Sequence, residues 1–179
     1  IHIVRDPRNV VTSIMNHWSL KDINASKELI INENNWLGLK NHENDVRSNQ
    51  IPTLISSWKT HYNSWKQNSQ NYLLIKYEDL ILNPIICFNE ITKFVSKVTK
   101  LNFNTEKVKK AIETNSFQNM KNLEKKGLFK ENALNREKNS KVDFFNLGPE
   151  NDWKKILDKK ISSEIENKFN NEMRELKYI

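Results

Sequence analysis

The chain has 179 residues, of which 37% are hydrophobic and 28% are charged, and its formal net charge is +7. This length and composition predict one domain with a real core and argue against a disordered chain. The single cysteine, Cys87, excludes an internal disulfide, and no apolar run has the length of a membrane span. We therefore expect a cytoplasmic protein with no membrane partner, whose charge favours anionic partners without choosing among them.

The first predicted element is a short buried strand, "IHIVR", whose β-branched residues suit a strand covered on both faces. Asp6 and Pro7 then predict a helix start, with Asp as the N-cap and Pro in the first helical position. A strand, a tight turn and a helix form the building block of a parallel α/β sheet. The helix carries an apolar stripe at helical spacing: Val10, Val11, Ile14 and Met15.

The middle of the chain alternates between uncertain and clear segments. Residues 19–50 are polar and irregular, and no element is predicted there. A helix carrying Ile55 and Trp58 is expected over residues 53–67, and a second buried strand from Tyr72 to Lys76, followed by a turn. Asn83 and Pro84 predict the start of the next helix.

The last third of the chain is predicted to be mainly helical. A charged connecting loop is expected over residues 124–150. Ser163 and Glu166 have the spacing of a capping box at the start of a closing helix. Two short helices precede the loop, over 105–114 and over 116–123 with Ser116 as cap, and the stripe of the closing helix is Ile165, Phe169, Met173 and Leu176.

Arg5 is the first candidate for a binding residue. It lies at the carboxyl end of the first predicted strand, which is the edge where open α/β sheets bind ligands. Ser13 follows nearly two helical turns later, and a guanidinium group with a nearby hydroxyl suits a phosphate or sulfate group. The alternative is that Arg5 pairs with a carboxylate of the helix while Ser13 faces solvent. Spacing alone leaves both interpretations open.

Aromatic residues supply further candidates. Tyr77 ends the second predicted strand at the same sheet edge, either as a hydroxyl donor to a ligand or as a half-buried ring with a wet tip. Phe117 and Met120, one turn apart in "NSFQNM", would sandwich a purine, although ordinary core packing is the favoured interpretation of the bare pattern. The four histidines show no metal-ligand spacing, and no glycine-rich phosphate loop is present.

Several segments, taken in order, resemble the cytosolic and bacterial sulfotransferases that use 3′-phosphoadenosine 5′-phosphosulfate (PAPS): "IHIVRDPRNVVTS", "SWKTHYNSW", "YLLIKYEDLILNP", "NSFQNM", "FFNLGPENDWKK" and "IENKFNNEMRELKY". The resemblance covers the C-terminal two-thirds of the family only. It implies an α/β fold of the P-loop NTPase-like, nucleotide-kinase-like type, with a parallel sheet flanked by helices and its N-terminal strands missing from this chain. Residues 1–179 would then form a single sulfotransferase domain fragment.

The resemblance also implies roles for residues at matching positions. The cofactor-binding positions are Arg5 and Ser13 at the 3′-phosphate, Tyr77 beside the adenine, Ser116, Phe117 and Met120 in the adenine-contacting stretch, and Gly148 in the closing loop. His17 and Trp18 are expected to line the acceptor pocket.

The implied reaction transfers a sulfonate group from PAPS to a hydroxyl or amine of a small-molecule or glycan acceptor, with no metal and no nucleic acid partner. The family's phosphosulfate loop and catalytic histidine precede the matched segments, so no catalytic residue is assigned and the chain alone is expected to be inactive. Asn146 and Leu147 replace a basic pair of the family, a loss of about 1.5–3 kcal/mol for each charged donor unless Lys130 or Lys141 substitutes. A degenerate non-catalytic relative and a basic polyanion-binding module therefore remain alternatives.

Overall fold

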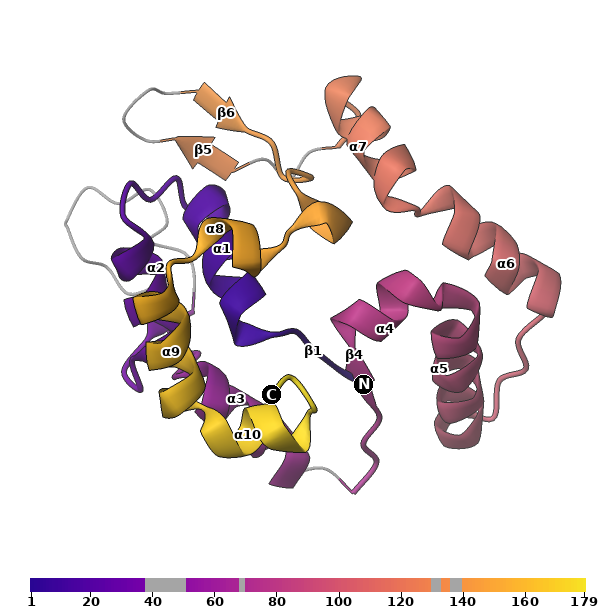
Figure 1. The fold of residues 1–179 in the computed structure, drawn as a ribbon. Coiled ribbons are helices and arrows are strands. Elements are labelled where there is room, and N and C mark those ends of the chain that lie inside the picture. The colour runs from indigo at the N-terminus through magenta and orange to yellow at the C-terminus, as the bar shows by residue number, and fades with distance from the viewer. Residues whose placement is uncertain (38–50, 68–69, 130–132, 136–139) are drawn as a thin grey trace.

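Two parallel strands lie between two groups of helices (Figure 1). β1 (His2–Val4) pairs with β4 (Leu74–Lys76), with His2 opposite Leu74 and Val4 opposite Lys76. Parallel strands require a long crossover connection, and the first three helices of the chain occupy it. The computed structural model describes residues 1–37, 51–67, 70–129, 133–135 and 140–179.

The helix α1 (Pro7–His17) begins directly after β1, as predicted. The Asp6 carboxylate caps it by accepting a hydrogen bond of 2.9 Å from the backbone N–H of Arg8, and Pro7 occupies the first turn. Val11 is fully buried, and the helix packs against three other helices of the chain. The strand, cap and helix were all predictable because their signals are local in sequence.

Residues 23–31 form a helix, α2 (Ile23–Ile31), so the prediction of no element over 19–50 is wrong. Asp22 caps it by accepting from the N–H of Asn24 at 2.9 Å. The buried side of α2 consists of Ile30 and two polar residues, Ser26 and Lys27. Polar residues on a buried face do not register as hydrophobic periodicity, so the pattern was missed.

A short antiparallel pair replaces the start of the predicted helix over 53–67. β2 (Trp36–Leu37) pairs with β3 (Thr53–Leu54), and α3 (Trp58–Gln67) begins only afterwards. Ser56 lies between β3 and α3 and has a φ of 61°, a left-handed conformation that interrupts a right-handed helix. The expected helix is therefore correct from Trp58 onward, and Ile55 lies outside it.

The segment that follows β4 is helical almost without a break. The turn expected after β4 is a helix, and the start predicted at Asn83 and Pro84 is confirmed. Ser116 caps the second of the two short helices by accepting from the N–H of Asn119 at 3.4 Å, as predicted. The bounds are α4 (Tyr77–Leu82), α5 (Pro84–Thr99), α6 (Thr105–Thr114) and α7 (Phe117–Lys125).

The C-terminal part supplies most of the core. The capping box predicted at Ser163 and Glu166 is wrong, because Asp158, five residues before Ser163, caps the helix by accepting from the N–H of Ile161. The predicted stripe is confirmed, since all four of its residues are buried. The remaining elements are β5 (Ala133–Asn135), β6 (Ser140–Val142), the 3₁₀ turn η1 (Gly148–Glu150), α8 (Trp153–Ile156), α9 (Lys159–Lys168) and α10 (Asn170–Glu175).

The core is built around the C-terminal helices. Phe169 is fully buried and touches Trp58 of α3, with ring centroids 5.2 Å apart. The buried cluster is Val11, Ile30, Leu157, Ile161, Ile165, Phe169 and Met173. Among the described residues, no helix is both long and apolar enough to span a bilayer.

Candidate functional site

The register of the two parallel strands brings Arg5 and Tyr77 together. Val4 lies opposite Lys76, so the next residue of each strand leaves the sheet at the same edge. The guanidinium carbon of Arg5 lies 4.2 Å from the centroid of the Tyr77 ring. Stacking of this kind orients the planar guanidinium and leaves its N–H groups free to donate in the plane. The indole of Trp58 also donates to the carbonyl oxygen of Arg5 at 3.1 Å, which holds its backbone in place.

Arg5 donates to two neutral oxygen atoms. Its Nη1 donates to Ser13 Oγ at 3.0 Å, and its Nη2 donates to the carbonyl oxygen of Gly148 at 3.2 Å. Its Nε is buried without a hydrogen-bond partner among the described residues. Among the described residues, therefore, Arg5 does not form an ion pair with a carboxylate, which was one of the two interpretations that its spacing allowed. Its positive charge is available to a ligand.

The Ser13 hydroxyl is held so that it can donate. Its Oγ accepts from Arg5 and also from Asn151 Nδ2 at 3.0 Å, which occupies both of its lone pairs. Asn151 is 7% exposed, and Thr12 fixes its orientation by donating to its Oδ1 at 2.7 Å. The Ser13 O–H and the Arg5 Nε–H are thus two donors suited to an anion.

Arg5 and Asn151 line a cleft of about 210 Å³. One wall is polar, and the other is formed by Ile81 and Leu82 of α4. A buried or half-buried cleft with one apolar wall and a few convergent donors is typical of small-molecule sites. The lining residues are Arg5, Asn9, Tyr77, Glu78, Ile81, Leu82, Pro149 and Asn151.

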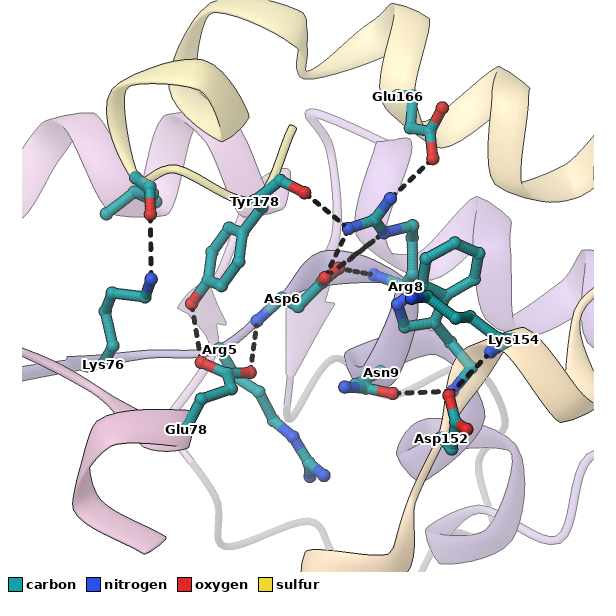
Figure 2. A network of polar contacts seen from close by, with 12 residues as sticks. Arg5, Asp6, Arg8, Asn9, Lys76, Glu78, Asp152, Lys154, Glu166 and Tyr178 are labelled. Carbon is teal, nitrogen blue, oxygen red and sulfur yellow. Dashed lines mark hydrogen bonds and ion pairs between the residues drawn. The ribbon is translucent and has the colours of Figure 1, made fainter. Parts of the chain in front are cut away.

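Glu78 is the carboxylate of the cleft, and its oxygens are already engaged (Figure 2). One accepts from the backbone N–H of Asp6 at 3.1 Å and the other from the Tyr178 hydroxyl at 2.9 Å. Burial and the nearby charge of Glu78 raise the pKa of Tyr178, so the phenol remains a donor. Glu78 therefore braces the end of β1 against the C-terminus.

Arg8, unlike Arg5, belongs to a structural network (Figure 2). It forms ion pairs of 2.6 Å with both Asp6 and Glu166, and it donates to the carbonyl oxygen of Tyr178 at 3.0 Å. The guanidinium of Arg5 points away from this network (Figure 2). The two arginines of the "RDPR" stretch thus serve different purposes, because only Arg5 reaches the cleft.

Gly148 connects Arg5 to the predicted adenine-binding stretch. Its φ is 51°, and a Cβ at this position would lie 2.1 Å from Cε2 of Phe117. The ring of Phe117 therefore packs directly on the glycine backbone, whose carbonyl receives Arg5. Ser116 caps the helix that carries Phe117, and Met120 is half-buried further along it. The ligand contacts of Ser116, Phe117 and Met120 stay predictions.

His17 and Trp18 lie at the other end of α1 from Arg5, about 15 Å along the helix. The His17 ring meets Phe144 edge-on at 5.8 Å, and Trp18 is 44% exposed. Neither residue lines the cleft. Their role in an acceptor pocket stays a prediction.

Two cleft residues, Asn9 and Asn151, were missed from the sequence. Asn9 accepts from the backbone N–H of Trp153 at 2.9 Å and lines the cleft. Asparagine belongs to no hydrophobic periodicity and to no motif considered above, so only the position of Asn9 four residues after Arg5 could have pointed to it. Lys130 lies outside the described residues, as does the side chain of Lys141. No group of three or more His, Cys, Asp or Glu that could hold a metal ion occurs in the part of the chain that the structure describes.

Comparison with known proteins places the chain in a family. A family model described as a sulfotransferase domain matches residues 1–177. The crystal structure of the mouse sulfotransferase SULT7A1 complexed with PAP is similar, at 20% sequence identity and a TM-score of 0.62. The match covers 96% of this chain and 57% of that one, so the chain spans little more than half of the solved protein.

No curated protein sequence matches the chain significantly. At 20% identity the structural match shows the fold, a mixed α/β architecture with a parallel sheet of the P-loop-like type. The family model, in contrast, covers almost every residue. Together with a cleft at the carboxyl edge of β1 and β4, this coverage shows that the chain belongs to the sulfotransferase family.

Proposed function

We propose that the chain binds PAPS through its 3′-phosphate and adenine, and that the protein transfers the sulfonate group of PAPS to a hydroxyl or amine of a small-molecule or glycan acceptor. The observation that carries the proposal is the pair of donors, Arg5 Nε–H and Ser13 O–H; Arg5 lines the cleft, and Ser13 contacts two residues that line it, Arg5 and Asn151. Family membership supports it. The mouse sulfotransferase of similar fold was solved with PAP, which adds support.

The residues of the cleft fit this nucleotide. A buried guanidinium nitrogen without a partner is costly, and a phosphate oxygen would satisfy it with a charge-assisted hydrogen bond. Tyr77 fixes the plane of Arg5, and Gly148 leaves the space that Phe117 fills. When bound, PAPS supplies the sulfonate group, while these residues hold and orient the nucleotide. No catalytic residue is assigned, and a cytoplasmic location and a single domain over 1–179 remain part of the proposal.

Isothermal titration with 3′,5′-diphosphoadenosine tests the binding step. Arg5→Ala should weaken binding about tenfold to a hundredfold, which corresponds to about 1.5–3 kcal/mol for a lost charged hydrogen bond. Adenosine 5′-phosphate lacks the 3′-phosphate and should bind both proteins equally weakly. Arg174→Ala is the matched control, because Arg174 is exposed on α10 and its side chain bonds only to Asn170 among the described residues. No heat from the unaltered chain at millimolar nucleotide would overturn the proposal.

A second candidate is a relative that binds nucleotide without transferring sulfonate. Asn146 and Leu147 favour it, because they place no charge on the segment next to Gly148. A transfer assay with radiolabelled PAPS and phenolic, amine and glycan acceptors, on the protein encoded by the whole gene, separates the two. Binding of 3′,5′-diphosphoadenosine with no labelled product would favour this second candidate.

A further inference from the structure

One face of α7 runs along the chain segment 144–148. The residues of this face, Phe117, Lys121 and Glu124, are spaced so that they share one side of the helix. Phe117 contacts Gly148, and Lys121 Nζ donates to the carbonyl oxygen of Asn146 at 3.1 Å. The pairing is antiparallel, since each later residue of α7 meets an earlier residue of the segment.

Glu124 makes the most specific of these contacts. Its Oε1 accepts from the backbone N–H of Phe144 at 2.6 Å, and its Oε2 accepts from that of Phe145 at 2.9 Å. A carboxylate that receives two consecutive backbone N–H groups forms two charge-assisted hydrogen bonds with defined geometry. Glu124 is half-buried, and its bond to Phe145 is partly buried, so water screens that bond less than it would on an open surface.

The far end of the segment is Gly148, which both Arg5 and Phe117 contact. Where Gly148 lies therefore depends on how the segment before it is held. We propose that Glu124, assisted by Lys121, is a positioning residue of the nucleotide site: it holds segment 144–148 on α7 so that Gly148 stays against Arg5 and Phe117. The effect on nucleotide affinity rests on the proposed function, whereas the holding of the segment does not.

Amide hydrogen exchange measured by NMR on the 179-residue chain tests the holding step. In Glu124→Ala the amides of Phe144 and Phe145 should exchange about tenfold faster, since each loses a charge-assisted hydrogen bond. The amide of the fully buried Val11 serves as reference for global opening and should not change. The matched control is Glu113→Ala, which removes an exposed carboxylate from neighbouring α6.

Titration with 3′,5′-diphosphoadenosine tests the consequence for the site. Glu124→Ala should bind about three- to tenfold more weakly, and Glu124→Gln, which keeps an acceptor oxygen, should recover part of that loss. Lys121→Met should weaken binding as well. Lys125→Met, an exposed position on the same helix, should bind as the unaltered chain does.

The outcomes are separable from those of the proposed function. Unchanged exchange at Phe144 and Phe145 in Glu124→Ala would overturn the proposal, whatever the nucleotide does. Faster exchange with unaltered nucleotide affinity would overturn the positioning role. If the unaltered chain binds no nucleotide while Glu124→Ala still loosens the segment, the proposed function falls and the holding of the segment by Glu124 stands.

Discussion

At the scale of single residues, the candidate site depends on hydrogen-bond donors that have no acceptor within the protein's described residues. Ser13 becomes an obligate donor because Arg5 and Asn151 occupy both lone pairs of its oxygen. The Nη1 and Nη2 atoms of Arg5 donate to neutral oxygens, while its Nε has no hydrogen-bond partner in the described part of the chain. Gly148 is needed for its backbone conformation and for the space that a Cβ would take from Phe117.

Gly148→Ala should weaken 3′,5′-diphosphoadenosine binding at least tenfold. A side chain at a positive φ costs roughly 1 kcal/mol or more, and the new Cβ would also displace the Phe117 ring from its place 2.1 Å away. Gly127→Ala is the matched control, because Gly127 also has a positive φ, 71°, yet nothing lies within 4 Å of the added Cβ. Equal nucleotide affinities for the two variants, measured by titration, would contradict the role assigned to Gly148.

At the scale of elements, buried charges fasten α1 to the C-terminal helices. Arg8 is 5% exposed and pairs with Asp6 at the start of α1 and with Glu166 of α9. The ring of Trp153 lies 4.0 Å from its guanidinium carbon. Because Arg8 lies in the first turn of α1, three residues after Arg5, the network holds the end of β1 beside the cleft (Figure 2).

Arg8→Met should lower the free energy of unfolding by about 3–5 kcal/mol, because it leaves the carboxylate of Asp6 buried and unpaired. Urea unfolding followed by tryptophan fluorescence measures the loss. Arg174→Met should change it by less than about 1 kcal/mol, as expected for an exposed side chain. A loss for Arg8→Met no larger than that of the control would show that the network does not stabilise the fold.

Two histidines, His2 and His61, meet at the contact between β1 and α3. His2 is 8% exposed, its ring lies 5.5 Å from that of His61, and its Nδ1 is 2.9 Å from the Tyr72 hydroxyl. Burial lowers the pKa of both histidines, and the charge of His61 lowers the pKa of His2 further.

Stability should therefore be full above about pH 6.5 and fall as the pH drops below it, because the unfolded chain then binds protons that the folded chain resists. Urea midpoints at pH 7.5 and pH 5.5 measure this fall. His61→Gln should reduce the difference between the two midpoints. An undiminished difference in that variant would assign the pH dependence to other groups.

At the scale of the whole molecule, exposed lysines outside the cleft contribute to the net charge of +7. Exposed lysines lie on consecutive turns of α8 and α9, among them Lys154, Lys155, Lys159 and Lys160. None of them lines the cleft. A general attraction to polyanions and a specific nucleotide site are thus expected on different parts of the surface.

Retention on a heparin column should fall steeply with added salt, because it arises from the general positive charge. Arg5→Ala should elute almost where the unaltered chain does, although it loses nucleotide affinity. Elution of Arg5→Ala at a much lower salt concentration would instead make the cleft the polyanion site and favour the polyanion-binding alternative.

The sequence predicted the helices whose starts are marked by a capping residue or a proline close to the start. Asp6 with Pro7, Asn83 with Pro84, and Ser116 each contain the start of a helix within a few residues. The helix α2 was missed because part of its buried face is polar, and the capping box at Ser163 was wrong because Asp158 supplies the cap instead.

The sequence alone determined that Arg5 and Tyr77 lie at the ends of two strands, at one sheet edge, where the structure places each of them directly after its strand, because strand ends and their following helices are encoded locally. It also determined the family, through motifs in a fixed order. Only the tertiary structure decided that Arg5 bonds to Ser13 and Gly148 rather than to a carboxylate. It also decided that Asn151 bonds to Ser13 and that Glu124 bonds to the backbone of Phe144 and Phe145. The physical reason is that these contacts join residues far apart along the chain, whose approach depends on how the helices pack.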